Sequence, residues 1–292
     1  MMRARSYRAC LALSQFGIIL AGMVRTKPGT KVVYLNDELW FNDFEKSLRY
    51  FPMKWLELRG CRKCDFIVTQ DPFRGRILRL LNKLPQDKLF YLPNSFPGPA
   101  ERSTSYYLHD LLNVDRQVKI VFWNGAATDG DGSLNIAQAA IDWGEDWLFV
   151  THFRSSGATG YKKQLADLHG KGRNAHVGKN FSLAELDKAF ASAHIGLALY
   201  PDRGVNAKHI GYSSGKLNAF LRQGVPCIVS AGSGLKWVPR SGAGLAVAEP
   251  VEVAQAMRRI DADYQAFSEG AMRVYEQLLR PDFALDSIVA RL

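Results

Sequence analysis

The sequence predicts an α/β protein with two Rossmann-like domains, each a parallel sheet flanked by helices. Short apolar runs alternate with amphipathic helical stretches along the chain, and this alternation is typical of parallel strands joined by crossover helices. A stretch rich in Pro, Gly and Ser at residues 93–105 separates two such series and is typical of a linker. A chain of 292 residues is long enough for two domains of ordinary size.

Three strands are expected before the linker, at residues 31–37, 65–70 and 88–95. Helices are expected between them, one of them with Pro72 near its start. The chain itself is expected to open with a core-facing helix, because an apolar stretch follows its basic start. A signal sequence or a peripheral membrane anchor, with Arg3, Arg5 and Arg8 against anionic lipid, is the alternative.

The second series is expected to form a larger parallel sheet. Ser182 and Glu185 have the spacing of a capping box, Ser214 can cap a helix whose buried stripe includes Leu217, and Gly224 suits the end of that helix. Strands are expected at 118–125, 146–153, 174–179, 195–201, 227–230 and in "GLAVAE". The predicted domains are residues 1–100 and 113–272, with a C-terminal helix at 273–292 that packs back on the first domain.

Composition indicates an anionic partner. The net charge is +10 with a pI of about 9.5, which favours a nucleotide, a phosphorylated lipid, a membrane surface or a nucleic acid. Nucleic acid is disfavoured because no recognition helix, zinc pattern or ribonucleoprotein motif is present. Cys61 and Cys64 form a CxxC without a second ligand pair, so we interpret them as thiols on a helix surface rather than a metal site. Free thiols indicate a reducing cytosol.

The turn "YSSGK" precedes the helix that Ser214 is expected to cap. A helix N-terminus offers unpaired N–H groups and a partial positive charge. Gly215 lets the backbone approach a ligand, Ser213 and Ser214 offer hydroxyl donors, and Lys216 adds a cation. These four residues together predict a phosphate site; an ordinary capped helix with a solvated lysine is the alternative.

The stretches "FSLAELDKAFASAHIGLALY" and "YSSGKLNAFLRQGVPCIVS" resemble the donor-binding domain of GT-B glycosyltransferases, particularly glycosyltransferase family 4. "VVYLNDELW", "DFIVTQDPFR" and "LFYLPNS" resemble the later strands of the acceptor domain, so the resemblance covers roughly residues 30–290. It implies transfer of a sugar from a nucleotide-sugar donor to a hydroxyl of a glycan, lipid or small molecule, without a metal cofactor. Apart from the resemblance, the free thiols predict a cytoplasmic protein, and the basic N-terminus predicts peripheral contact with an anionic inner membrane face. No nucleic-acid partner is expected.

The chain departs from the family pattern in two respects. Family 4 members typically carry two glutamates in this region, and the matching positions here are Gly211 and Ala219. A non-catalytic nucleotide-sugar-binding protein or a truncated glycosyltransferase is therefore the alternative function. With three expected strands, the N-terminal domain is predicted to be incomplete and to expose an edge or a face of its sheet.

Candidate site residues follow the predicted strands. Asp37 or Glu38 can act as a base on an acceptor hydroxyl, or they cap the following helix. Asp129 and Asp131 form a D-x-D in a Gly-rich turn that we interpret as a loop, so no metal site is predicted. The remaining candidates are the proposed stabiliser of the leaving diphosphate, His209, and the donor-binding residues Arg203, Tyr212, Asn124, Gly125 and Arg154.

Overall fold

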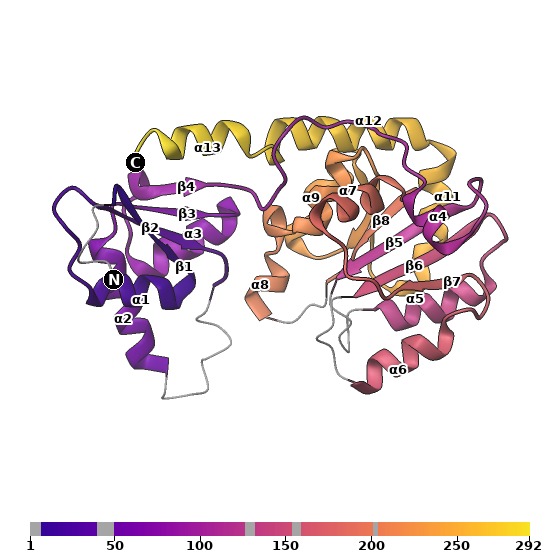
Figure 1. Ribbon diagram of the computed structural model, residues 1–292, viewed down its shortest axis with the longest axis horizontal. Helices are drawn as coiled ribbons and strands as arrows, with labels where there is room; N and C mark the ends of the chain where they lie inside the picture. Colours follow the sequence, from indigo (N-terminus) through magenta and orange to yellow (C-terminus); the bar gives the residue numbers. More distant parts are fainter. Residues whose placement is uncertain (1–6, 40–49, 126–131, 154–158, 201–203) are drawn as a thin grey trace. The chain divides into compact units, whose positions relative to one another are not determined.

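The protein was analysed as a computed structural model that describes all residues except 1–6, 40–49, 126–131, 154–158 and 201–203 (Figure 1). The chain divides into two compact units. Unit 1 consists of residues 1–97, 203–213 and 281–292, and unit 2 consists of residues 98–202 and 214–280. The candidates Arg203 and Arg154, and the pair Asp129 and Asp131, lie outside the described residues.

Unit 1 contains a parallel sheet of four strands in the order β1-β2-β3-β4. Crossover helices join successive strands, as parallel pairing requires. The strands are β1 (Ala9–Leu13), β2 (Lys31–Asn36), β3 (Phe66–Thr69) and β4 (Leu89–Tyr91), and the helices are α1 (Ser14–Met23), α2 (Tyr50–Lys63), α3 (Pro72–Asn82), α8 (Gly204–Lys208) and α13 (Asp282–Val289).

The two faces of the unit 1 sheet are covered unequally. One face packs on α1, α2 and α3 around a core that includes Ile18, Tyr34 and Leu78. On the other face, Val33, Phe66 and Val68 pack with Ile288 of α13. The edge strand β1 stays open on that second face, since Leu11 and Leu13 are 59% and 62% exposed. The exposed edge that we expected is therefore present.

Two expectations for unit 1 are wrong. The described chain begins its regular structure with strand β1, and the expected helix follows it, so unit 1 has four strands rather than three. β1 forms because it pairs in parallel with β2, from Ala9 opposite Lys31 to Leu13 opposite Leu35. The second error concerns Cys61 and Cys64, which are free but buried within the core rather than on a helix surface.

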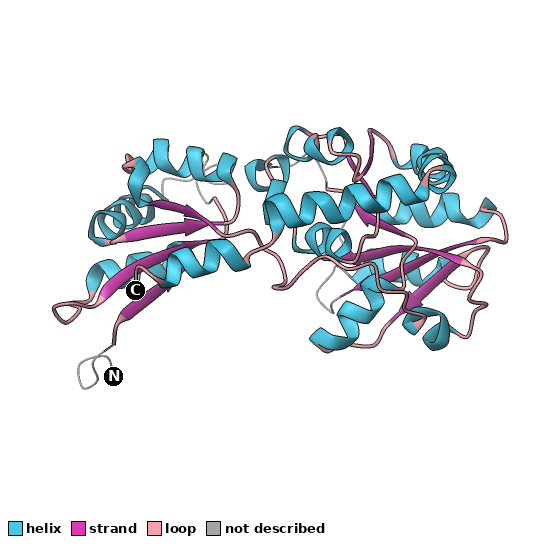
Figure 2. Ribbon diagram, turned by 90° about the horizontal axis from the view of Figure 1, so that it is seen from above, coloured by secondary structure: helices cyan, strands magenta, loops and turns pink. Residues whose placement is uncertain are grey.

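Unit 2 contains a parallel sheet of six strands in the order β10-β9-β8-β5-β6-β7. Helices cover both of its faces (Figure 2). The strands are β5 (Lys119–Gly125), β6 (Trp147–Phe153), β7 (Asn174–Val177), β8 (Ile195–Ala198), β9 (Cys227–Ser230) and β10 (Gly244–Val247). The helices are α4 (Tyr107–Leu112), α5 (Ser133–Ala139), α6 (Thr159–Leu168), α7 (Leu183–Ala191), α9 (Gly215–Arg222), α10 (Trp237–Arg240), α11 (Val253–Ala262) and α12 (Tyr264–Val274). The expected parallel α/β sheet with β8 beside β9 is confirmed.

Local sequence signals explain how the unit 2 helices are placed. The Ser182 and Glu185 capping box is formed at the start of α7. Ser214 caps α9, and Gly224 adopts a φ of +62° just after that helix. Gly196 in β8 lets α9 approach the sheet, because a Cβ there would lie 2.4 Å from the Phe220 ring. Phe220 in turn packs edge-on against Phe122 and Phe190.

Within the residues that the structure describes, no helix combines the length and apolar character that a membrane crossing requires.

Candidate nucleotide site and candidate acceptor cavity

The N-terminus of α9 is formed by the turn that the sequence singled out. The Ser214 hydroxyl accepts a hydrogen bond from the Leu217 N–H at 3.3 Å, so Ser214 is the N-cap. The hydroxyl also bonds to the phenol oxygen of Tyr200, at the end of β8. This second bond fixes the N-terminus of α9 at the carboxyl edge of the sheet, which is where ligands bind in open α/β folds.

Lys216 does not extend into solvent as a mobile charge. Its ammonium lies 4.4 Å from the centre of the Trp123 ring and 4.6 Å from the centre of the Tyr200 ring. Both distances are those of cation–π contacts. Trp123 belongs to β5 and Tyr200 follows β8, and these two strands are neighbours in the sheet. The aromatic rings therefore hold the ammonium over the strand ends at the helix N-terminus.

Gly125, the last residue of β5, leaves space beside this cation. A Cβ on Gly125 would lie 3.4 Å from Lys216 Nζ and 3.5 Å from the indole Nε1 of Trp123. Trp123 is buried, and its indole N–H has no acceptor among the described residues. Two nitrogen donors thus flank one position at the strand end, and an anionic oxygen is the group that suits such a position.

The side-chain oxygen of Asn124 is held by a neighbouring histidine. Its side-chain oxygen lies 2.7 Å from Nδ1 of the buried His152. The other ring nitrogen of His152 lies 3.0 Å from the Lys179 carbonyl oxygen, and the imidazole stacks on Phe181 with ring centres 4.4 Å apart. Asn124 therefore positions the end of β6 through His152.

The remaining predicted residues of the turn belong to unit 1. The chain passes from unit 1 to unit 2 between Ser213 and Ser214. Ser213 is buried, and its hydroxyl has no hydrogen-bond partner among the described residues. The backbone N–H of Tyr212 donates to Asp71 at 3.0 Å, while its carbonyl accepts from the Asn94 N–H at 3.3 Å.

Asp71 and Arg74 hold the segment 204–213 within unit 1. The Asp71 carboxylate caps α3 by accepting from the N–H groups of Phe73 and Arg74. The buried Arg74 guanidinium donates to the carbonyl oxygens of Asp37 (3.0 Å), Asn206 (2.6 Å) and His209 (2.9 Å). These two side chains join the ends of β2 and β3 to the segment that carries His209.

His209 is a candidate proton acceptor rather than a cation. Its ring lies against Phe73, with ring centres 4.5 Å apart. Burial lowers the pKa of His209 below its ordinary value, and the adjacent Lys208 adds to this effect. Both effects favour the neutral form of the imidazole, which can accept a proton.

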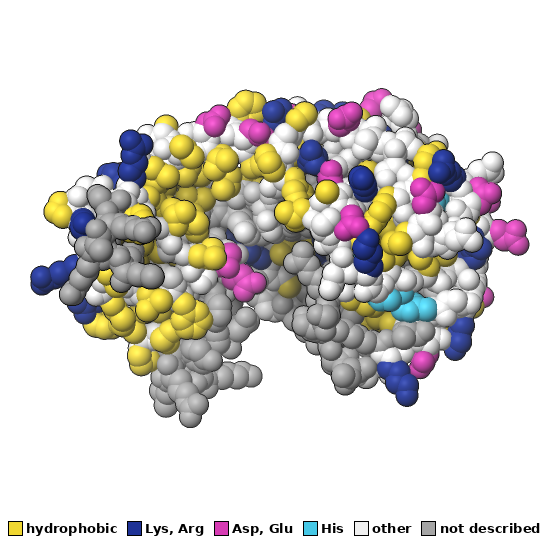
Figure 3. Space-filling view, in the orientation of Figure 1, with side chains coloured by type: hydrophobic (Ala, Val, Ile, Leu, Met, Phe, Trp, Pro, Cys, Tyr) yellow, Lys and Arg dark blue, Asp and Glu magenta, His cyan; other side chains and the backbone are white. Residues whose placement is uncertain are grey.

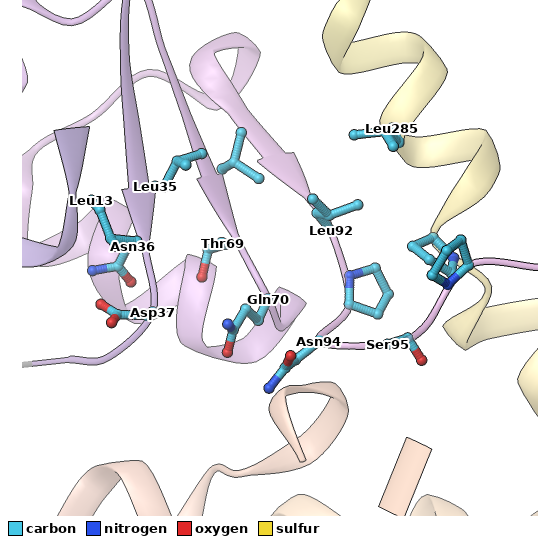
Figure 4. Close-up of a pocket in the computed structure, with 14 residues that line it drawn as sticks. Leu13, Leu35, Asn36, Asp37, Thr69, Gln70, Leu92, Asn94, Ser95 and Leu285 are labelled. Atoms are coloured by element: carbon cyan, nitrogen blue, oxygen red, sulfur yellow. The ribbon is translucent and has the colours of Figure 1, made fainter. Parts of the chain in front are cut away.

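A cavity of about 360 Å³ lies at the carboxyl edge of the unit 1 sheet (Figure 4). Asp37 lines it, and its carboxylate accepts from the Glu38 N–H at 3.1 Å. Glu38 is exposed and is not among the lining residues. The lining is partly polar and partly apolar: Asn36, Asp37, Thr69, Gln70, Asn94 and Ser95 are polar, and Leu13, Leu35, Val68, Leu92, Pro93, Pro97, Pro281 and Leu285 are apolar. Leu285 of α13 lies at the opposite side of the cavity from Asn36 and Asp37 (Figure 4).

Gly211 and Ala219, the positions at which the resemblance to family 4 leads one to expect glutamates, are both buried in this structure. At Gly211 the φ is +41°, and a Cβ would lie 2.1 Å from a carboxylate oxygen of Asp71. Ala219 is buried in α9, so a glutamate there would carry its charge into the core. Neither position accepts a ligand-facing carboxylate in this structure.

Sequence reasoning missed Trp123, Tyr200 and Asp71. Trp123 and Tyr200 lie at the ends of apolar strands, a position that signals a ligand edge. Their convergence on Lys216 depends on strand order, which periodicity does not reveal. Asp71 directly precedes Pro72, which is a readable helix-start signal.

No protein-family model matches the chain, and no curated protein matches it. Several solved structures do match the chain. Sucrose-phosphate synthase from Thermosynechococcus elongatus aligns with a TM-score of 0.70 at 16% identity, covering 97% of this chain and 72% of that one. Anabaena HepE in complex with UDP and glucose aligns with a TM-score of 0.69 at 13% identity, covering 98% and 77%. WaaG, a glycosyltransferase involved in lipopolysaccharide biosynthesis, aligns with a TM-score of 0.61 at 11% identity, covering 89% and 77%.

Proposed function

We propose that this chain, which has the GT-B fold of those structures, is a glycosyltransferase that moves a sugar from a nucleotide-sugar donor to an acceptor hydroxyl. The observation that carries the proposal is the Lys216 ammonium, held against Trp123 and Tyr200 at the N-terminus of α9. The HepE complexes with UDP and UDP-glucose support UDP as the first nucleotide to test.

The proposed chemistry assigns one task to each group. When the bond between the sugar and the diphosphate breaks, the electron pair stays on the diphosphate oxygen, which gains negative charge. Lys216 and the first N–H groups of α9 stabilise that charge. The acceptor oxygen forms the new bond to the same carbon of the sugar, and its proton passes to a base, for which Asp37 at the unit 1 cavity is the candidate. That no metal takes part stays a prediction.

A second candidate function is nucleotide-sugar binding without transfer. The buried position of Ala219 and the contact between Gly211 and Asp71 favour it, because both family carboxylates are replaced. Binding of UDP without release of UDP from UDP-sugars, in the presence of glycan and lipid acceptors, would support this alternative.

Calorimetric titration with UDP tests the site. A charge-assisted hydrogen bond contributes about 1.5–3 kcal/mol, so Lys216→Ala should weaken UDP binding by about tenfold to a hundredfold. Lys236→Ala is the matched control, because Lys236 is an exposed lysine of the same unit, and we expect it to bind UDP as the parent does. Leu217→Ala should instead lower stability first, since Leu217 is buried.

If Lys216→Ala binds UDP as tightly as the parent, the turn is only a helix cap and the nucleotide site is wrong. The thermal unfolding midpoint of each variant separates a lost contact from a lost fold. A Lys216→Ala variant that melts at the parent temperature and loses UDP supports the proposal.

A further inference from the structure

The net positive charge of the protein belongs to one unit. Unit 1 contains 20 Lys and Arg residues against 10 Asp and Glu, whereas unit 2 contains 18 of each. Unit 1 therefore carries the entire net charge of +10, and the unit with the proposed nucleotide site is neutral. A nucleotide bound in unit 2 does not account for this excess, which favours an anionic partner for unit 1.

Exposed apolar side chains are also concentrated in unit 1. Among the described residues, 14 of the 20 large hydrophobic side chains that are exposed belong to it, although it is the smaller unit. Figure 3 shows hydrophobic side chains gathered over α1. An apolar surface of this kind marks an interaction site when it is contiguous.

Helix α1 carries the clearest such surface. Its sequence, SQFGIILAGM, contains no charged residue, and a helix that is apolar all round is normally buried. One side is buried, where Ile18 and Ile19 pack in unit 1. Phe16, Leu20 and Met23 are 51%, 62% and 61% exposed, and their spacing of four and three residues places them on one helical face.

Cations gather at the end of this apolar face. Arg25 and Lys27 are exposed and directly follow α1. Arg8 and Lys31 are exposed at the starts of β1 and β2, where the Lys31 N–H donates to the Arg8 carbonyl. A crossover helix returns to the edge at which the next strand starts, so the end of α1 and these strand starts share one edge of unit 1.

We propose that unit 1 binds the surface of an anionic lipid bilayer through α1. The exposed face formed by Phe16, Leu20 and Met23 enters the boundary between headgroups and acyl chains, while Arg25 and Lys27 pair with lipid phosphates. Charge complementarity selects this occupant, because a second copy of the chain would bring a second unit of net charge +10 against the first. The inference is independent of the proposed nucleotide site.

Co-sedimentation of the full chain with vesicles tests the proposal. Binding is expected on phosphatidylcholine vesicles that contain phosphatidylglycerol, with much weaker binding on phosphatidylcholine alone. Replacing an inserted Leu by a polar residue in Leu20→Asn should reduce partitioning by about tenfold. Arg25→Gln and Lys27→Gln should each reduce it by about fivefold, and this cationic part should weaken as salt is raised.

Leu183→Asn is the matched control, because Leu183 is 68% exposed on α7 of the neutral unit; it should bind vesicles as the parent does. Equal binding of the parent to both kinds of vesicle, or unchanged binding of Leu20→Asn, would overturn the proposal. A parent dimer in sedimentation equilibrium that Leu20→Asn converts to a monomer would also overturn it, in favour of a second copy. If Leu20→Asn melts below the parent, the variants Arg25→Gln and Lys27→Gln decide instead.

Discussion

Unit 2 closes its sheet on both faces, whereas unit 1 leaves part of one face open. In β9 of unit 2, Cys227, Ile228 and Val229 are all fully buried. In unit 1, Leu11 of β1 is opposite Val33 of β2, yet Val33 is 1% exposed and Leu11 59%. Neighbouring apolar residues on one sheet face thus differ in what covers them. Burial, rather than residue type, decides which of them contribute to stability.

The largest expected effect is on the stability of unit 2, where a buried and an exposed side chain can be compared. Phe220 is fully buried and contacts two other phenylalanines and the backbone of β8. Phe220→Ala should lower the free energy of unfolding of unit 2 by about 3–5 kcal/mol. Hydrogen exchange of the β8 and β9 amides in urea measures it. Leu183→Ala, on the exposed side of α7, is the control and should change stability by less than about 0.5 kcal/mol.

The effect of intermediate size is a loss of stability at low pH, which we expect mainly in unit 2 because that unit contains five of the six histidines. Burial lowers the pKa of His194 from 6.5 to about 4, although Asp261 bonds to the ring. The unfolded chain then binds a proton more readily than the folded one, so stability present above pH 6.5 is lost as the pH falls toward 4. The loss should reach about 3 kcal/mol for His194 by pH 4.

The variant that tests this pH dependence is His194→Gln, which keeps a donor for Asp261 but does not titrate. Its unit 2 amides should lose less protection between pH 6.5 and 4 than those of the parent. His176, whose pKa burial also lowers to about 4, should account for part of the remaining loss. An acid transition confined to unit 1 amides would contradict the comparison.

The smallest expected change in unfolding free energy tests directly whether β1 is uncovered in unit 1. Leu11→Asn should change the unfolding free energy by no more than about 0.5 kcal/mol, because Leu11 is exposed. Val33→Asn, at the paired position, should cost several times more because it places an amide in the core. Urea titration of both variants measures the difference. Equal losses would mean that a partner covers β1 in solution.

Much of the fold could be predicted from the sequence because its signals are local. The nine predicted strands are present, as are the capping box at Ser182 and the cap at Ser214. The strand β1 was missed because "ACLAL" continues directly into the apolar helix α1 without a turn residue between them. Periodicity does not separate two adjoining apolar elements.

The candidate site was less predictable because it depends on contacts between distant residues. Lys216 could be named from its place in the turn, but its contacts with Trp123 and Tyr200 depend on the adjacency of β5 and β8. Asn124 stays a predicted ligand contact, but the hydrogen bond of its side-chain oxygen to His152 could not be predicted, because it depends on the pairing of β5 with β6. The assignment of His209 and Ser213 to a unit other than that of Lys216 follows from the course of the whole chain. No local pattern encodes such pairings.

The three separate segments of unit 1 have a consequence for biosynthesis. Its first 97 residues are translated early, but Ile288, which packs on Val33, Phe66 and Val68, belongs to the segment 281–292. A ribosome therefore makes all of unit 2 while that apolar sheet face still lacks its helix. During this interval the nascent chain presents the kind of surface that chaperones bind and that aggregates form from. The sheet of unit 1 is thus translated before that of unit 2 but gains its covering helix after it.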